Sequence, residues 1–393
     1  MIIAKSKDTI FALSSGYGKS AIALIRISGP LSNKIIKKIS CNPPKKAKVA
    51  TLNKIKNKEG KIIDQTITTY YKAPKSFTGE DVYEISVHGG NAVIKKITEL
   101  LKKNQARLAD PGEFTKRAFE NNKLDLTQVE AISDLINSET EKQREQAHNQ
   151  LNGKLSTEIK NIQKKISKVL ADTEATIDFA DEDLPKNLVL NLKEQIKNIC
   201  KDIKALIKKS DGDSKIRSGF VASIVGKPNT GKSSFINHLS NQDIAIVTSE
   251  PGTTRDALES IIDIFGISVR FYDTAGIRKS KNNIEKIGVE KTLKITKESD
   301  INIVFIDNTK DYNELKNLKN PIFVQSKKDI RKKPINKNNI INISSKSGEG
   351  IEKLRKKIYT NLKKKYSENY LISRERHKIC LEKSLKSLEK SIK

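Results

Sequence analysis

The sequence predicts a multidomain protein that combines α/β regions with all-helical ones. Short apolar strands alternate with one or two helices in residues 1–120, long amphipathic helices fill residues 121–215, and strands alternate with helices again over residues 216–369. These patterns indicate a small α+β domain, a helical bundle and a domain with a mostly parallel sheet. Residues 370–393 return to the helical period, so we expect the third domain to be inserted into a discontinuous bundle whose second part is incomplete.

Length and composition indicate a folded chain rather than a disordered one. With 393 residues and 36% hydrophobic side chains, two or three packed domains are expected. No run of eighteen apolar residues occurs, and charges begin before any signal-peptide core, so we expect a cytoplasmic protein without a membrane span. Cys41, Cys200 and Cys380 are too far apart for a C-x-x-C pattern, which indicates neither a disulfide framework nor a zinc site.

The net charge of +28 has two readings. Lysine and arginine that neutralise phosphates release counterions, so the excess is consistent with a nucleic-acid partner. The lysines are also spread throughout the chain, as a compositional bias of the source would leave them. Charge alone does not decide between the two.

Local patterns place the elements of the first two domains. In residues 1–120 we expect strands and one helix at Thr9–Leu13, 21–28, 66–71, 82–87 and 91–103. In the helical region, three apolar stripes run over 129–136, 151–170 and 189–207. The sequence Asp-Gly-Asp-Ser at 211–214 breaks the third stripe, and we expect it to end that helix.

The most specific motif is G-K-P-N-T-G-K-S-S at residues 226–234, which follows the apolar run 220–225. A buried strand, a glycine-rich turn and a helix that opens at Lys232 match the phosphate loop G-x-x-x-x-G-K-[ST] in its required context. Backbone N–H groups and the helix N-terminus would hold phosphates, Lys232 would reach the outer ones, and Ser233 would ligate Mg²⁺. The alternative is a glycine turn that binds nothing, and the motifs downstream argue against it.

Those downstream motifs form the ordered set of a Ras-like P-loop GTPase. A threonine loop, an Asp-x-x-Gly turn and two loops after buried strands follow over about 120 residues. Asp329 is expected to select guanine, because a carboxylate accepts both the N1–H and the exocyclic amine of that base. The predicted GTP-binding residues are Asn229, Thr230, Gly231, Lys232, Ser233, Ser234, Thr248, Ser249, Glu250, Pro251, Gly252, Thr253, Thr254, Asp273, Thr274, Ala275, Gly276, Ser326, Lys327, Asp329, Ser344, Ser345 and Lys346.

Two positions depart from that set. Ser326 replaces the asparagine of Asn-Lys-x-Asp, so we expect the contact that braces the base and phosphate loops to be shortened or lost, with weaker binding and guanine preference kept. Ile277 follows Gly276 where Ras-type enzymes carry a water-positioning glutamine. Because an aliphatic group cannot orient water, another residue must do so.

Three stretches of the first domain resemble one family. They are S-F-T-G-E-D-V-Y-E-I at 76–85, H-G-G at 88–90 and A-D-P-G-E-F-T-K-R-A-F-E-N-N-K-L-D-L at 109–126, and they are similar to the MnmE/TrmE family of tRNA-modification GTPases. The resemblance implies an N-terminal domain that binds 5-formyl- or methylene-tetrahydrofolate and forms a homodimer. Its folate contacts would fall on Arg26, Glu84 and Lys123, which would otherwise be ordinary surface charges.

The resemblance also implies how GTP is hydrolysed. The family's catalytic glutamate would be Glu285, and its K⁺ ligands would be Asn229, Thr248, Glu250 and Thr253. Mg²⁺ would be held by Ser233 and Thr254. K⁺-dependent dimerisation of the GTPase domains would then activate turnover.

The activity that the resemblance implies is tRNA modification. With an FAD-dependent MnmG/GidA-type partner, the chain would form a heterotetramer. This complex would add a (carboxymethyl)aminomethyl group at C5 of the wobble uridine, position 34, of certain tRNAs. The family's C-terminal Cys-x-Gly-Lys signature is missing, so the sequence is either a fragment or a reduced member. The alternative function is an RNA- or ribosome-associated GTPase switch of the Era/Der kind, without modification activity.

Overall fold

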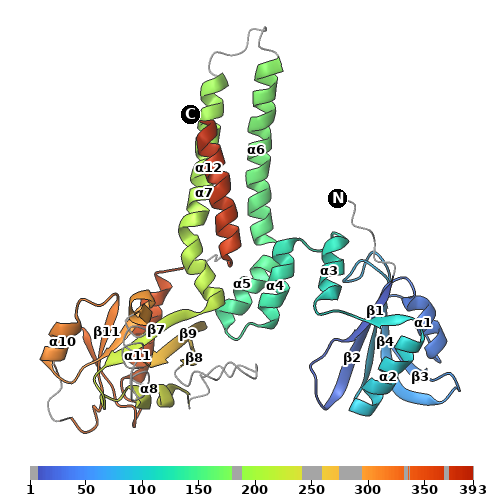
Figure 1. The fold of residues 1–393 in the computed structure, drawn as a ribbon, viewed down its shortest axis with the longest axis horizontal. Helices are drawn as coiled ribbons and strands as arrows, with labels where there is room; N and C mark the ends of the chain where they lie inside the picture. Colours follow the sequence, from blue (N-terminus) through green and yellow to red (C-terminus); the bar gives the residue numbers. More distant parts are fainter. Residues whose placement is uncertain are drawn as a thin grey trace, which may run out of the picture. The chain divides into compact units, whose positions relative to one another are not determined.

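The computed structural model describes residues 8–178, 188–240, 259–273, 294–331, 335, 337–366 and 371–392. The chain divides into two compact units, Met1–Glu130 and Ala131–Lys393 (Figure 1). Within the described residues, no helix is both long and apolar enough to span a membrane.

The first unit is built on a six-stranded sheet with the strand order β3-β4-β5-β2-β1-β6. Neighbouring strands are antiparallel except for β1 and β6, which run parallel. Apolar side chains of the two helices α1 and α2 join those of the sheet in one core. The elements are β1 (Thr9–Leu13), β2 (Ser20–Ser28), α1 (Ser32–Ile39), β3 (Thr51–Lys56), β4 (Ile62–Tyr71), β5 (Val82–Gly89), α2 (Asn91–Lys103), β6 (Ala106–Leu108) and α3 (Glu113–Glu120).

The alternation of side chains along β2 and β5 decides what each face of this sheet carries. Ile25, Ile27 and Ile85 belong to the core that includes the helices. Arg26 and Glu84 are paired in register between the two strands. Because successive residues of a strand point to opposite faces, these two charged residues lie on the face away from that core.

The predicted elements of this unit are largely confirmed. The strand at Thr9–Leu13 and the helix at Asn91–Lys103 have the expected bounds. The strand expected at 66–71 begins earlier, at Ile62, because it pairs with β3 in a hairpin from its first residue. The unit therefore has the predicted α+β class, with a largely antiparallel sheet and separate helices.

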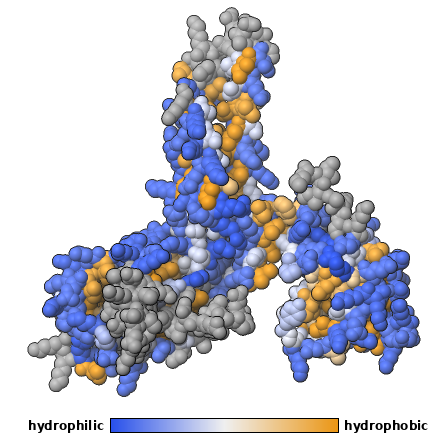
Figure 2. All heavy atoms as spheres, in the orientation of Figure 1, coloured by the Kyte–Doolittle hydropathy of each residue, from blue (hydrophilic) through white to orange (hydrophobic). Residues whose placement is uncertain are grey.

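The second unit contains a bundle of helices. These are α5 (Glu141–Leu151), α6 (Lys154–Asp178), α7 (Leu188–Ser218) and α12 (Glu375–Ser391), preceded by α4 (Leu126–Ile136), which starts in the first unit. Buried side chains of α6, α7 and α12 pack together in one apolar core. Figure 2 shows hydrophilic side chains over most of the face in view, with apolar ones gathered along these helices.

One sequence expectation about this bundle was wrong. The stretch 211–214 does not end the third helix, because α7 continues without a break to Ser218. Gly212 sits where the chain returning from the second sheet touches the helix: a Cβ added there would lie 1.6 Å from the carbonyl oxygen of Lys365. Glycine is needed at this point for close backbone approach, so it does not mark a helix end.

A second six-stranded sheet is inserted between α7 and α12, with the order β12-β11-β10-β7-β9-β8. All neighbouring strands are parallel except β8 and β9, which confirms the predicted mostly parallel sheet. The elements are β7 (Phe220–Gly226), α8 (Lys232–Leu239), β8 (Glu259–Ile264), β9 (Ile267–Asp273), β10 (Ile301–Phe305), α10 (Thr309–Leu315), β11 (Pro321–Gln325), β12 (Ile340–Asn342) and α11 (Ile351–Lys363).

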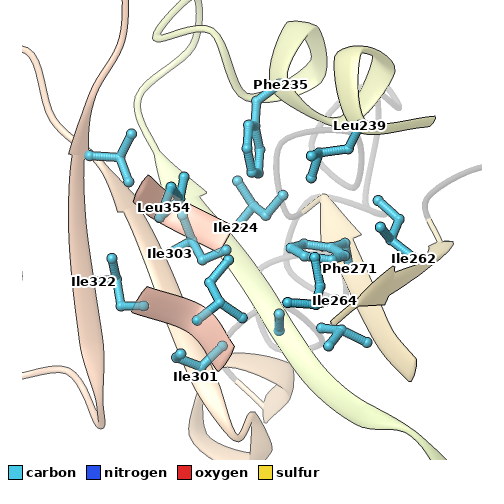
Figure 3. Packing of buried hydrophobic residues seen from close by; sticks show 14 of the residues in the cluster. Ile224, Phe235, Leu239, Ile262, Ile264, Phe271, Ile301, Ile303, Ile322 and Leu354 are labelled. Atoms are coloured by element: carbon cyan, nitrogen blue, oxygen red, sulfur yellow. The ribbon is translucent and has the colours of Figure 1, made fainter. Parts of the chain in front are cut away.

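The core of this sheet fixes the helix that follows the phosphate loop. Phe235 of α8 is buried and packs edge-on against Phe271 of β9, with ring centroids 6.3 Å apart. Figure 3 shows Phe235 directed at Ile224 of β7 and Phe271. The first turn of α8 is therefore held over the carboxyl end of β7.

The chain passes from the helical bundle into the second sheet after α7 and returns before α12. Two carboxylates, Asp134 and Asp300, each contact both of these connecting segments. Asp134 of α4 accepts hydrogen bonds at Oδ1 from Arg217 Nε at 2.8 Å and from Arg374 Nη2 at 2.7 Å. Arg217 lies at the end of α7, where the chain leaves the bundle, and Arg374 is the N-cap of α12, where it returns. The Asp134 side chain is thus hydrogen-bonded to both connecting segments, at the point where each meets the bundle.

Asp300 does the same on the sheet side. Its buried carboxylate pairs with Lys215 of α7, and Lys365 Nζ lies 3.4 Å from the same oxygen. Lys365 Nζ also donates to the backbone oxygen of Asp300 at 2.5 Å. Burial lowers the pKa of Lys365, although the charge of Asp300 opposes that change.

Candidate functional site

The phosphate loop joins the end of β7 to the start of α8, and its two flanking glycines are required by close contacts. Gly226 has φ 154°, and a Cβ there would lie 2.6 Å from the carbonyl oxygen of Phe305. Gly231 has φ 91°, and a Cβ there would lie 2.8 Å from Ser326 Oγ. Both positions exclude larger side chains, so the loop can curl tightly before the helix begins.

The lysine of the motif lies inside that curl. Lys232 is 3% exposed, and its Nζ donates to the carbonyl oxygens of Gly226 at 2.9 Å and Lys227 at 2.5 Å. Thr230 Oγ1 donates to the same Lys227 oxygen at 2.8 Å. An ammonium held at the centre of a loop that opens into a helix N-terminus forms a site for a polyanion.

Ser233 and Asn229 are exposed at the rim of this loop. Ser233 occupies the first turn of α8, where its hydroxyl suits an Mg²⁺ that also contacts phosphates. Asn229 has φ 61°, a conformation that asparagine tolerates better than most residues. Both fit the oxygen chemistry expected of hard cations.

The base-side loop is joined directly to the phosphate loop by Ser326, which decides between the two outcomes expected for this contact. Ser326 follows β11, is 3% exposed and donates from Oγ to the carbonyl oxygen of Thr230 at 2.5 Å. The hydroxyl reaches its partner because Gly231 has no side chain to hold the loops apart. The brace between the two loops is therefore made and is not lost.

A tight turn after Ser326 presents Asp329. Lys327 has φ 61°, and the N–H of Arg331 donates to the Lys327 carbonyl oxygen at 3.1 Å. Asp329 is exposed within this turn. The N–H of Lys328 donates to the carbonyl oxygen of Ile343 at 3.0 Å, which ties the turn to the strand that leads to Ser344.

The loop after β12 completes the described part of the site. Ser344 is buried and its Oγ accepts from the N–H of Ser347 at 3.2 Å. Ser345 is half-buried and Lys346 is exposed. The structure therefore brings together three of the predicted segments, the phosphate loop, the 326–329 turn and the 344–346 loop, at the carboxyl edge of one sheet.

Other predicted residues lie outside the described part of the chain. These are Thr248, Ser249, Glu250, Pro251, Gly252, Thr253, Thr254, Thr274, Ala275, Gly276 and Glu285, together with the side chain of Asp273. Asp273 itself ends β9, next to the phosphate-loop strand. The K⁺ and Mg²⁺ sets are thus represented among described residues by Asn229 and Ser233 alone.

Two of the three predicted folate residues are in direct contact. Arg26 Nη2 donates to Glu84 Oε1 at 2.7 Å, and Arg26 Nε donates to the same oxygen at 2.9 Å. Two aromatic rings flank the guanidinium, Phe77 at 5.3 Å and Phe114 at 5.6 Å from its central carbon. Charged and aromatic groups that converge in this way suit a flat heterocycle with an anionic tail.

Lys123 lies in the turn after α3 and approaches the loop that contains Gly79. A Cβ at Gly79 would lie 3.3 Å from Lys123 Cγ, which places the lysine stem against the loop that also carries Phe77. Tyr71 Oη donates to the second oxygen of Glu84 at 3.4 Å, a contact that the sequence patterns did not anticipate. The strand-like run at 66–71, which ends at Tyr71, was the available sequence signal.

The charged residues beside the nucleotide motifs were also not anticipated. Lys227 of the phosphate loop lies 2.6 Å from Asp311, and Arg331 pairs with Asp307. Asp307 and Asp311 follow a buried strand of the sheet, and Arg331 stands two residues after Asp329. Those positions were the only sequence signals for these contacts.

Comparison with known proteins covers nearly the whole chain. Residues 9–123 match the family described as GTP-binding protein TrmE N-terminus, and residues 126–393 match the MnmE helical domain. The tRNA modification GTPase MnmE of Pelagibacter ubique is 43% identical over 97% of this chain and 89% of its own. The proteins of the same name from Roseobacter denitrificans and Aquifex aeolicus are each 38% identical over 98% of this chain and cover 88% and 89% of their own lengths.

Among solved structures, the G domain of the T. maritima FeoB iron transporter is 23% identical and covers 36% of this chain and 98% of its own, with a TM-score of 0.28. The matches to the two family domains and to the curated relatives extend over both units of the chain. The chain belongs to the MnmE family of tRNA modification GTPases.

Proposed function

We propose that the chain binds GTP with Mg²⁺ and hydrolyses it in the service of tRNA modification. The observation that carries the nucleotide site is the buried Lys232 inside a curled loop that Ser326 joins to the turn bearing Asp329. Lys232 and the loop N–H groups would bind the phosphates, Ser233 and Thr254 would ligate Mg²⁺, and Asp329 would select guanine.

Turnover is proposed to depend on K⁺ and on Glu285. Asn229, Thr248, Glu250 and Thr253 would supply oxygens to the ion, whose charge would offset that developing on the γ-phosphate. Glu285 would orient the attacking water that Ile277 cannot orient. Dimerisation of two GTPase domains would complete this arrangement.

The first unit is proposed to bind a formyl- or methylene-tetrahydrofolate and to form the homodimer. Glu84 would accept paired N–H groups of the pterin, and Arg26 and Lys123 would face the anionic glutamate tail. The Arg26–Glu84 pair and its flanking Phe77 and Phe114 support this assignment.

In the cell, we place the chain in the cytoplasm with an FAD-dependent MnmG/GidA-type partner. Together they would add the (carboxymethyl)aminomethyl group at C5 of wobble uridine 34. The corresponding domains would be residues 1–120, 121–215 with 370–393, and 216–369. The domain of residues 1–120 would bind the folate, and the inserted domain of residues 216–369 would bind and hydrolyse GTP.

The experiment for the whole proposal is mass spectrometry of wobble uridines in a strain that lacks its own family member. Expression of this chain is expected to restore the modified uridine, and expression of the Glu285→Ala variant is not. GTP turnover of the purified chain in K⁺ and in Na⁺ is measured in parallel. Turnover that is equal in both salts would contradict the K⁺ mechanism. Turnover without restored modification would favour the Era/Der-like switch.

A further inference from the structure

The inserted sheet carries a second connection between the phosphate loop and the base-side turn, made by charged side chains. Lys227 Nζ of the phosphate loop lies 2.6 Å from Asp311 Oδ1. The N–H of Asp307 donates to Asp311 Oδ2 at 3.1 Å. Arg331, at the end of the base-side turn, donates from Nη2 to Asp307 Oδ1 at 2.6 Å and from Nη1 to the Asp307 carbonyl oxygen at 3.0 Å.

Asp311 is the buried residue at the centre of this connection. Its side chain is 3% exposed, and its N–H donates to Oδ1 of Asn308, the N-cap of α10, at 3.0 Å. Burial acts to raise the pKa of Asp311, but the neighbouring ammonium of Lys227 and the backbone donors outweigh it and the pKa is lowered. A buried carboxylate that remains charged holds its cationic partner in place.

Arg331 links the connection to the guanine-specifying residue. Its N–H closes the turn on the Lys327 carbonyl oxygen at 3.1 Å, and Asp329 lies inside that turn. Because the Arg331 guanidinium is also held by Asp307, the turn cannot move relative to β10 without breaking two hydrogen bonds. The position of Asp329 therefore depends on Asp307.

We propose that Asp307 and Asp311 form a charged brace, from Lys227 through to Arg331, that positions the phosphate loop and the base-side turn for one nucleotide. This brace acts in parallel with the hydrogen bond from Ser326 to Thr230, the two together doing what an asparagine does in the Asn-Lys-x-Asp pattern. The proposal rests on the proposed function, namely that the chain binds guanine nucleotides. The brace residues are positioning residues that act through Lys232 and Asp329.

Parallel braces have a measurable signature. When one is removed, the other still limits the separation of the two loops, so each single loss is small. When both are removed, the loops are free and the loss exceeds the product of the single effects. Such coupling is the sign that two contacts serve one geometry.

The test measures how fast a fluorescent GDP analogue dissociates from the full chain by stopped-flow. Asp311→Asn and Ser326→Ala are each expected to speed dissociation roughly three- to fivefold, and the double variant by more than the product of the two. Glu352→Gln is the matched control, because Glu352 pairs with Arg355 at 2.9 Å on α11 without joining two loops. A double variant that equals the product, or an Asp311→Asn rate equal to that of the unmodified chain, overturns the proposal.

Variants of Lys227 and Arg331, the two ends of the brace, protect the test against a folding defect in the buried Asp311 variant. Lys227→Gln and Arg331→Gln remove the ends of the brace at exposed or half-buried sites and are expected to speed dissociation as well, while Arg331→Lys restores part of the effect. Melting temperatures of all variants are recorded, because a purely structural role would lower them without the coupling to Ser326. If the unmodified chain binds no guanine nucleotide, the proposed function fails. If it binds normally and the variants match it, only the brace fails.

Discussion

Ser326 Oγ donates a hydrogen bond to the carbonyl oxygen of Thr230 at 2.5 Å, across the gap between the base-side turn and the phosphate loop. The two residues are 96 positions apart in the chain, and they lie in the loops that follow β7 and β11. Their contact is possible because Gly231, next to Thr230, leaves room for the hydroxyl. The loops that would hold base and phosphate are therefore connected by one buried hydrogen bond.

Loss of that hydrogen bond is expected to weaken nucleotide binding. Ser326→Ala leaves the Thr230 carbonyl without this donor, and a net loss of about 1 kcal/mol corresponds to roughly fivefold lower affinity. Isothermal titration with GDP measures it. Ser299→Ala is the matched control, because buried Ser299 also loses one hydroxyl bond to a backbone oxygen, that of Ile295 at 2.6 Å. Equal affinity losses in the two variants would mean that the Ser326 contact has no special role.

Asp134, which is hydrogen-bonded to both segments that connect the bundle with the sheet, should contribute to the stability of the second unit. Asp134→Ala removes the common acceptor of Arg217 and Arg374. Because these arginines are partly exposed, we expect a loss on the order of 1–3 kcal/mol in the free energy of unfolding. Urea unfolding followed by circular dichroism measures it. Asp202→Ala, which breaks an exposed pair with Lys165, is expected to cost less than half as much. The reverse order would refute the assigned role.

Gly212 should not tolerate even a methyl group. Alanine favours a helix over glycine by about 1 kcal/mol, so propensity alone predicts a stabilised α7. A Cβ at 212 would lie 1.6 Å from the Lys365 carbonyl oxygen, so the backbone must shift and we expect Gly212→Ala to be destabilising. Thermal unfolding decides the sign. Gly16→Ala, where no atom lies within 4 Å of the added Cβ, is the control and should leave the melting temperature unchanged.

The first unit should lose stability in acid through Glu113. Hydrogen bonds from Arg107, opposed by burial and supported by Asp110 and Arg117, lower the pKa of Glu113 from 4.5 to about 2. A carboxyl whose pKa is depressed on folding stabilises the protein above its unfolded value and loses that contribution as pH falls. The loss should run from about pH 4.5 to about pH 2 and, because solvent screens the exposed Arg107 partner, amount to about 1–2 kcal/mol.

Glu113→Gln tests this pH dependence. The variant should be less stable than the unmodified chain at neutral pH, and the difference should shrink as pH falls through the window below 4.5. Urea midpoints of the two proteins at several pH values measure it. A stability difference that stays constant from pH 7 to pH 3 would show that Glu113 does not titrate in this way.

Local sequence patterns predicted much of this fold because they report on single strands and helices. The phosphate loop, the parallel strands that follow it and the strand at Thr9–Leu13 each have a signature within one short window. Gly212 was misread for the same reason. Its local signal resembles a helix end, whereas its role comes from Lys365, 153 positions later.

The contacts between distant segments had no such signature. Asp134 meets Arg217 and Arg374 across 83 and 240 positions, and neither spacing is a motif. Residue type predicted a weakened contact at Ser326, and only the approach of the backbones at Gly231 shows that the hydroxyl reaches its partner. The motifs of the proposed nucleotide site could thus be read from the sequence, but the contacts that join its loops could not.

Competition between nucleotides for the full chain tests the proposed guanine nucleotide site most directly. Fluorescent GDP is displaced by unlabelled GTP or ATP in the presence of Mg²⁺, with Lys232→Ala as the variant that removes the buried ammonium. We expect GTP to displace the probe, ATP to fail at the same concentrations, and Lys232→Ala to bind neither. Displacement by ATP as effective as that by GTP, or unchanged binding in Lys232→Ala, would contradict the assignment of a guanine nucleotide site.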